Sequence, residues 1–211
     1  MGNLFKLDIK PVLEKFNIKN FIETGTLYGD CIKNVLYTGH NFDKIYTIEI
    51  VEILAESAGL QFGDNKTVSV INSNSVDGLV QIFDKELKGP TMFWLDAHFP
   101  GVDSGHNNMN MNDEHNMPLK EELELIKKHR SNCNDVIIMD DMWIFKDFPE
   151  LPVTFDQHMI NHGRTLRRSH LTNEDSIDWI TDMFKDTHTS KTVLIDQGFL
   201  ILFPKISNEI N

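Results

Sequence analysis

The chain has 211 residues, of which 40% are hydrophobic and 25% are charged, and its net charge is -12. This length and composition are typical of one globular domain with a substantial core, and no apolar run reaches the roughly 20 residues of a membrane-spanning helix. An acidic chain repels the phosphate backbone of nucleic acids. The two cysteines, Cys31 and Cys133, match no disulfide or metal-binding pattern. We therefore expect a single cytoplasmic domain over 1–211, with no nucleic-acid or membrane partner, as a monomer or a homodimer.

Strand-like and helical segments alternate along the chain. In chain order, the expected elements are a helix at 9–18, a strand at 20–24, a helix at 29–38, a strand at 44–50, a helix at 51–62, a strand at 67–74, a helix at 75–87, a strand at 91–97, a helix at 118–130, a strand at 135–141, a helix at 174–184 and two strands within 191–205. Strands that alternate with helices predict a parallel sheet, whereas the last two strands form a hairpin. The predicted fold is α/β: a Rossmann-like three-layer sandwich whose seven-stranded sheet is mostly parallel and carries a C-terminal antiparallel hairpin. In such sheets ligands bind beyond the carboxyl ends of the strands.

A glycine-bearing turn follows the first expected strand, in the segment FIETGTLYGD. Gly25 and Gly29 allow a tight backbone turn and the close approach of a ligand, and Glu49 ends the second strand 24 residues after Gly25 (49 − 25). This spacing is typical of folds in which a carboxylate accepts hydrogen bonds from ribose hydroxyls. Because Glu23 and Asp30 flank the turn, its charge favours a ligand with an ammonium and a sulfonium over one with phosphates.

The same segment resembles motif I of class I S-adenosylmethionine (SAM)-dependent methyltransferases, and the resemblance extends in motif order over 20–204. Leu27 departs from the glycine common in that motif, and in INSNS (71–75) Asn74 replaces the usual Asp that contacts adenine. The resemblance implies SAM as the cofactor. The positions implied to bind it are Glu23, Thr24, Gly25, Thr26, Tyr28, Gly29, Asp30, Glu49, Ile50, Asn74, Ser75 and Asp96.

Three aspartates end the fourth and fifth expected strands, at Asp96, Asp140 and Asp141. Their mutual repulsion would be relieved by a hard divalent cation, and all-oxygen ligands favour Mg²⁺, with Mn²⁺ or Ca²⁺ as alternatives. The arrangement is similar to that of metal-dependent O-methyltransferases of the catechol type and of the macrocin-type sugar family. We therefore expect Asp96, Asp140 and Asp141 as metal ligands. The competing interpretation is that Asp96 contacts SAM or orients a loop, while Asp140 and Asp141 cap a turn.

The expected reaction is methyl transfer to a hydroxyl that the metal activates. The proposed catalytic residues are His98 as general base, together with Asp96 and Asp140, and Lys146 and His162 are alternative bases. The long segment 99–117 is expected to be a lid over the acceptor.

The family resemblance favours a sugar acceptor, a deoxyhexose or glycan. A catechol or phenol acceptor, or a nucleoside-binding module without catalysis, is an alternative. A dinucleotide-dependent oxidoreductase is disfavoured because the chain has no GxGxxG motif.

Overall fold

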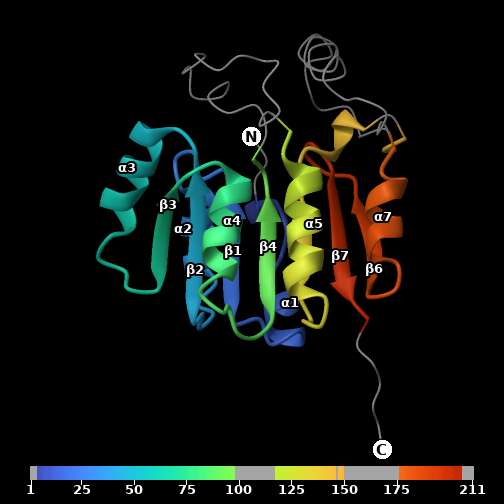
Figure 1. Ribbon diagram of the computed structural model, residues 1–211, viewed down its shortest axis with the longest axis horizontal. Helices are drawn as coiled ribbons and strands as arrows, with labels where there is room; N and C mark the ends of the chain where they lie inside the picture. Colours follow the sequence, from blue (N-terminus) through green and yellow to red (C-terminus); the bar gives the residue numbers. More distant parts are fainter. Residues whose placement is uncertain (1–3, 98–116, 146, 150–175, 206–211) are drawn as a thin grey trace, which may run out of the picture.

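A computed structural model describes residues 4–97, 117–145, 147–149 and 176–205 of the protein (Figure 1). Its single sheet has the strand order β3-β2-β1-β4-β5-β7-β6. The strands are β1 (Asn20–Thr24), β2 (Lys44–Glu49), β3 (Val68–Asn72), β4 (Thr91–Leu95), β5 (Val136–Met139), β6 (His188–Val193) and β7 (Phe199–Pro204). The first five strands pair in parallel, and β7 lies antiparallel between β5 and β6. The predicted seven-stranded fold with its C-terminal hairpin is confirmed.

Helices cover both faces of the sheet, because side chains alternate in direction along each buried strand. On β1 and β4, Ile22 and Phe93 face one core, whereas Phe21 and Trp94 face the other. The first core is covered by α4 (Ser75–Phe83), α5 (Leu119–Arg130) and α7 (Asp178–Phe184). The second is covered by the 3₁₀ helix η1 (Leu4–Lys6) and by α1 (Lys10–Lys15), α2 (Asp30–Tyr37) and α3 (Glu52–Phe62).

Several element boundaries differ from the sequence-based expectation, and three of them illustrate the differences. The first helix ends at Lys15, and Asn17 then adopts a left-handed φ of 50°. The helix after β3 ends at Phe83, and Glu86 has a φ of 56°. Strand β6 begins at His188, three residues before the expected 191. No helix in the described part of the chain combines the length and apolar character that crossing a bilayer requires.

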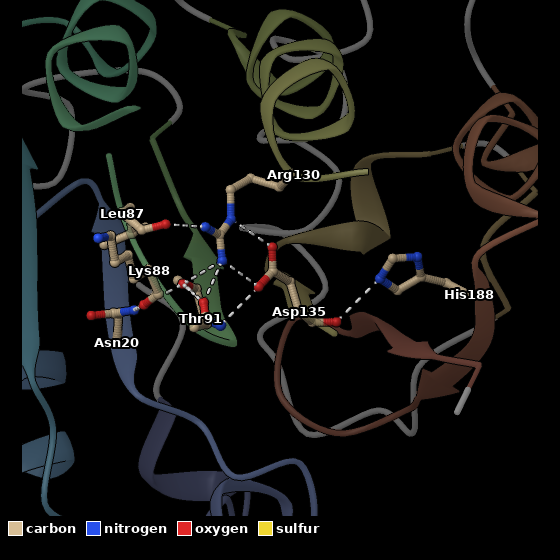
Figure 2. Close-up of polar contacts among 8 residues, drawn as sticks. Asn20, Leu87, Lys88, Thr91, Arg130, Asp135 and His188 are labelled. Carbon is tan, nitrogen blue, oxygen red and sulfur yellow. Dashed lines mark hydrogen bonds and ion pairs between the residues drawn. The ribbon is translucent and has the colours of Figure 1, made fainter. Parts of the chain in front are cut away.

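The amino ends of β4 and β5 are joined by a buried ion pair (Figure 2). The Arg130 guanidinium, at the end of α5, donates to both carboxylate oxygens of Asp135 at 2.9 and 2.8 Å. It also donates to the carbonyls of Leu87 and Gly89, both at 2.6 Å. Thr91 donates its backbone N–H to Asp135 at 2.8 Å. This cluster holds α5, β5 and the loop before β4 together at the lower edge of the sheet in Figure 1.

Candidate functional site

The turn between β1 and α2 lies at the carboxyl edge of the sheet and packs directly on the end of β4. Gly25 has a φ of 84°, and a Cβ placed there would lie 2.6 Å from the carbonyl oxygen of Asp96. Gly29 has a φ of 73°, and its Cβ would lie 2.7 Å from the Phe62 ring. Both positions therefore require glycine, on grounds of conformation and of space.

The Glu49 carboxylate joins this turn to the end of β2. Its side chain is buried, and its two oxygens accept the backbone N–H groups of Leu27 and Val51, each at 2.8 Å. A carboxylate oxygen can accept two hydrogen bonds, so each oxygen of Glu49 retains acceptor capacity. Glu49 thus shapes the turn and can also accept hydrogen bonds from a ligand's hydroxyls.

The N-terminus of α2 begins immediately after the turn. Gly29 occupies the cap position, and no side chain among the described residues caps the helix there. The first N–H groups of a helix have no partner within the helix and attract anions. A carboxylate group of a ligand therefore fits this end of α2.

Glu23 lies beneath the turn and not on its surface, with 1% of its area exposed. The Thr47 hydroxyl donates to it, and the Cys31 thiol is a second hydrogen-bonding partner. Burial raises the pKa of Glu23 to about 8, and these two hydrogen bonds oppose the shift. The group is therefore largely a neutral acid at pH 7. This differs from the expectation that Glu23 supplies a full negative charge to the turn, because the sequence pattern does not show how deeply the side chain is buried.

Asp96 and Asp140 follow the neighbouring strands β4 and β5. The Asp140 backbone N–H donates to the Leu95 carbonyl at 3.1 Å, which keeps the two strand ends in register. Burial raises the pKa of Asp96 well above its ordinary range, and the charge of Asp141 raises it further. The electrostatic influence of Asp141 on Asp96 agrees with the expectation that the strand-end carboxylates act on one another.

Asp141 occupies the corner after β5 in a left-handed conformation, with a φ of 55°. This conformation costs a residue other than glycine about 1–2 kcal/mol. One Asp141 oxygen accepts the indole N–H of Trp143 at 3.0 Å, and one Asp140 oxygen accepts the Asp141 backbone N–H at 2.6 Å.

The predicted magnesium site on Asp96, Asp140 and Asp141 is not supported. In the part of the chain that the structure describes, no three His, Cys, Asp or Glu side chains are close enough to share a metal ion. One carboxylate oxygen of Asp140 and one of Asp141 instead accept N–H groups of the protein. The sequence spacing predicts that these strand ends are neighbours, but not the direction of the oxygens.

The remaining predicted positions have diverse surroundings. Asn74 caps α4: its oxygen accepts the Asp77 backbone N–H at 2.8 Å, and its amide donates to the Asp77 carboxylate at 2.7 Å. Ser75 is buried.

Of the predicted residues around the turn, Tyr28 is exposed, and Asp30 pairs with Lys33 at 2.8 Å. Thr24, at the end of β1, and Thr26, in the turn, are buried, and Ile50 is half-buried after β2. His98, Lys146, His162 and the lid expected at 99–117, apart from Met117, lie outside the described residues.

Among the residues that the sequence analysis did not assign to this site is Gln197, which lies in the turn between β6 and β7. The Trp143 indole N–H is shared between Asp141 and the Gln197 side-chain oxygen, the latter at 3.1 Å. Trp143 was recognisable as an aromatic residue after β5, but no local pattern signals a partner 54 positions later in the chain.

Comparison with known proteins identifies the fold. No family model and no curated protein matches the sequence. Among solved structures, the chain is similar to a Staphylococcus aureus protein provisionally assigned as a caffeoyl-CoA O-methyltransferase, with 16% identity and a TM-score of 0.61 over 97% of this chain and 85% of that one. It is also similar to SAH-bound methyltransferase PaMTH1 from Podospora anserina, with 12% identity and a TM-score of 0.59 over 93% and 76% of the two chains. A third is an O-methyltransferase from Bacillus cereus in complex with SAH, with 17% identity and a TM-score of 0.52 over 93% and 79%. The protein therefore has the Rossmann-like fold of these methyltransferases.

Proposed function

We propose that the protein is a SAM-dependent O-methyltransferase. The observation that carries the proposal is the Gly25 turn, which packs on the end of β4 at the carboxyl edge of the sheet with the Glu49 carboxylate bound to it. Similar structures that hold SAH, the product of methyl transfer from SAM, have the same fold and support this choice.

The residues around the turn fit the groups that SAM carries. Glu49 retains acceptor capacity for ribose hydroxyls, and the uncapped start of α2 suits the carboxylate of the amino-acid portion. Glu23 lies buried beneath the turn with a raised pKa, so we assign it to supporting the turn. Recognition of the ammonium is therefore assigned to other groups at this edge.

SAM, when bound, supplies an electrophilic methyl carbon. The acceptor oxygen forms a bond to that carbon while the carbon–sulfur bond breaks, and the hydroxyl proton passes to a base of the protein. We propose His98 as that base. Asp96, which follows β4 and packs against the Gly25 turn, is the described carboxylate that we propose assists at this edge. Asp140 and Asp141 orient the acceptor, and no metal is assigned to the described carboxylates.

For the acceptor we propose a hydroxyl of a sugar, such as a deoxyhexose or a glycan, on the resemblance of the strand-end motifs to sugar O-methyltransferases. A catechol or phenol is the second candidate. It is favoured by the caffeoyl-CoA assignment of the Staphylococcus aureus protein and by the partly buried Trp143 at the corner after β5.

The first test is calorimetry with SAM, SAH and NAD. We expect SAM and SAH to bind and NAD not to bind, and absence of SAM binding would overturn the proposal. The second test is transfer of labelled methyl from SAM to a panel of sugars and catechols, with and without EDTA. We expect transfer to a sugar that survives EDTA. Binding of SAM without transfer to any acceptor would instead indicate a nucleoside-binding module.

A further inference from the structure

The corner after β5 is held by a distant part of the chain, the turn between β6 and β7. The backbone N–H of Met142 donates to the Gly198 carbonyl, and that of Trp143 donates to the Gln197 carbonyl, both at 3.1 Å. These bonds fix the chain immediately after Asp141, whose left-handed conformation persists only where surrounding structure enforces it.

Side-chain hydrogen bonds also link the corner after β5 to the turn between β6 and β7. The Trp143 indole N–H lies 3.0 Å from an Asp141 carboxylate oxygen and 3.1 Å from the Gln197 side-chain oxygen, so it donates to both. Because an indole N–H is only a donor, the Gln197 amide must present its oxygen and not its nitrogen. Gln197 therefore contacts Trp143 through its backbone carbonyl and its side chain, and the indole in turn orients the buried Asp141 carboxylate.

The turn that carries Gln197 is itself anchored. Its neighbour Asp196 forms an ion pair with Lys6 of η1 at 2.7 Å, and only 3% of the Asp196 side chain is exposed. The Asp196 carboxylate is buried but the Lys6 side chain is 36% exposed, so water partly screens the pair, which still ties the turn to η1. The support for Asp141 thus runs through three segments: the corner, the hairpin turn and η1.

We propose that Trp143 and Gln197 are positioning residues, which hold the Asp141 carboxylate in the direction that the acceptor requires. The part of this inference that concerns the acceptor rests on the proposed function. The hydrogen bonds that link Gln197, Trp143 and Asp141 do not depend on it. Removal of either residue leaves the Asp141 charge in place and changes its direction. The expected defect is therefore in the reaction of the acceptor and not in the binding of SAH.

The activity test compares Trp143→Phe and Gln197→Leu with the wild type. We expect kcat/KM for the acceptor to fall about tenfold in each variant, while SAH affinity stays within about twofold and Tm within a few degrees. Gln197→Glu, which keeps an acceptor oxygen for the indole N–H, is expected to restore most of the activity.

Two control variants match these changes. Trp179→Phe alters a partly buried tryptophan whose indole N–H has no partner among the described residues, and Gln81→Leu alters an exposed glutamine on α4. Both are expected to retain wild-type kcat/KM. Equal activity of Trp143→Phe, Gln197→Leu and the wild type would overturn the inference, as would a fall in activity that merely follows lost SAH binding or a lowered Tm.

An NMR experiment keeps the inference testable if the wild type transfers no methyl group to any acceptor, which would contradict the proposed function alone. Three indole N–H signals are expected from the three tryptophans, and Trp143→Phe assigns one of them. That signal should shift in Gln197→Leu and in Asp141→Gly, which removes the carboxylate but tolerates the left-handed conformation. An unchanged signal in both variants would overturn the inference, and a shift in both would support it.

Discussion

Two carboxyl groups are equally buried at opposite edges of the same sheet, but one is paired with a cation and the other is not. Glu23 and Asp135 are each 1% exposed. Asp135, at the amino edge, faces the Arg130 guanidinium, which partly offsets the rise that burial causes in the pKa of Asp135. Glu23, at the carboxyl edge, contacts a hydroxyl and a thiol, and no lysine or arginine of the described residues pairs with it. Asp135 at the amino edge is thus stabilised by an ion pair. Glu23 at the carboxyl edge instead retains its proton, because burial raises its pKa.

Breaking the pair at the amino edge should have the largest effect. Arg130→Met leaves Asp135 buried without its cation, which typically costs about 3–5 kcal/mol of the free energy of unfolding. Urea unfolding followed by circular dichroism measures the loss. Lys128→Met, an exposed change on the same helix, is the control and should cost less than about 0.5 kcal/mol. A loss below about 1 kcal/mol for Arg130→Met would show that the pair does not stabilise this edge.

At the carboxyl edge, Gly25→Ala should have the next largest effect. It combines a strained φ with a Cβ only 2.6 Å from the Asp96 carbonyl oxygen, so we expect about 2–3 kcal/mol of destabilisation and at least tenfold weaker SAH binding. Gly39→Ala is a matched control, because its φ is 68° but nothing lies within 4 Å of the added Cβ. That variant should lose about 1 kcal/mol and bind SAH normally. Equal SAH affinity in both variants would contradict the placement of the ligand at the Gly25 turn.

The pH dependence of stability tests the proton on Glu23. Its pKa is about 8 in the folded protein, against 4.5 for the ordinary group, so folding takes up a proton between these values and stability falls as pH rises from 4.5 to 8. Glu23→Gln removes this dependence. Relative to the wild type, it should gain on the order of 2 kcal/mol between pH 5 and pH 6.5. Asp30→Asn, at an exposed position of the same edge, is expected to follow the wild-type curve, and a Glu23→Gln curve parallel to the wild type would refute the assignment.

The smallest effect is expected at His188, where the sign is opposite. Its Nε2–H donates to the Asp135 carbonyl, and burial lowers its pKa, so the folded protein resists protonation. Stability from this group is present above pH 6.5 and is lost as pH falls below it. His188→Gln should cost about 1 kcal/mol at pH 8 and flatten the acid side of the stability curve. His129→Gln, exposed on α5, is the control; identical acid-side slopes in the two variants would count against the role of His188.

The sequence predicted the sheet better than the ends of the helices. Buried apolar runs stop at polar residues such as Glu49 and Asp140, so the strand ends could be located to within a few residues. The helix ends could not, because they depend on left-handed residues at Asn17 and Glu86. Asn adopts this conformation with some frequency, whereas Glu gives no such signal.

The sequence placed the candidate-site carboxylates at the ends of strands, but it did not predict their hydrogen bonds. The pattern placed Glu49 at a strand end, yet did not show that its oxygens accept two backbone N–H groups. The same limit applies to Arg130 and Leu87, which lie 43 positions apart. Contacts of this kind form only when helices pack on the sheet, and no local periodicity encodes them.

The hairpin turn beside Trp143 has a consequence for the synthesis of the protein. Gln197 is translated 54 residues after Trp143, and β7, which follows it, must insert between β5 and β6. A nascent chain can therefore pair β1 to β5 before the corner at Asp141 has its support. Such distant contacts form late in folding because closing long loops is entropically costly. The Gly25 turn, which we propose binds SAM, could then be assembled before β7 is synthesised, whereas the corner at Asp141, which we propose faces the acceptor, would be completed only after β7 has emerged.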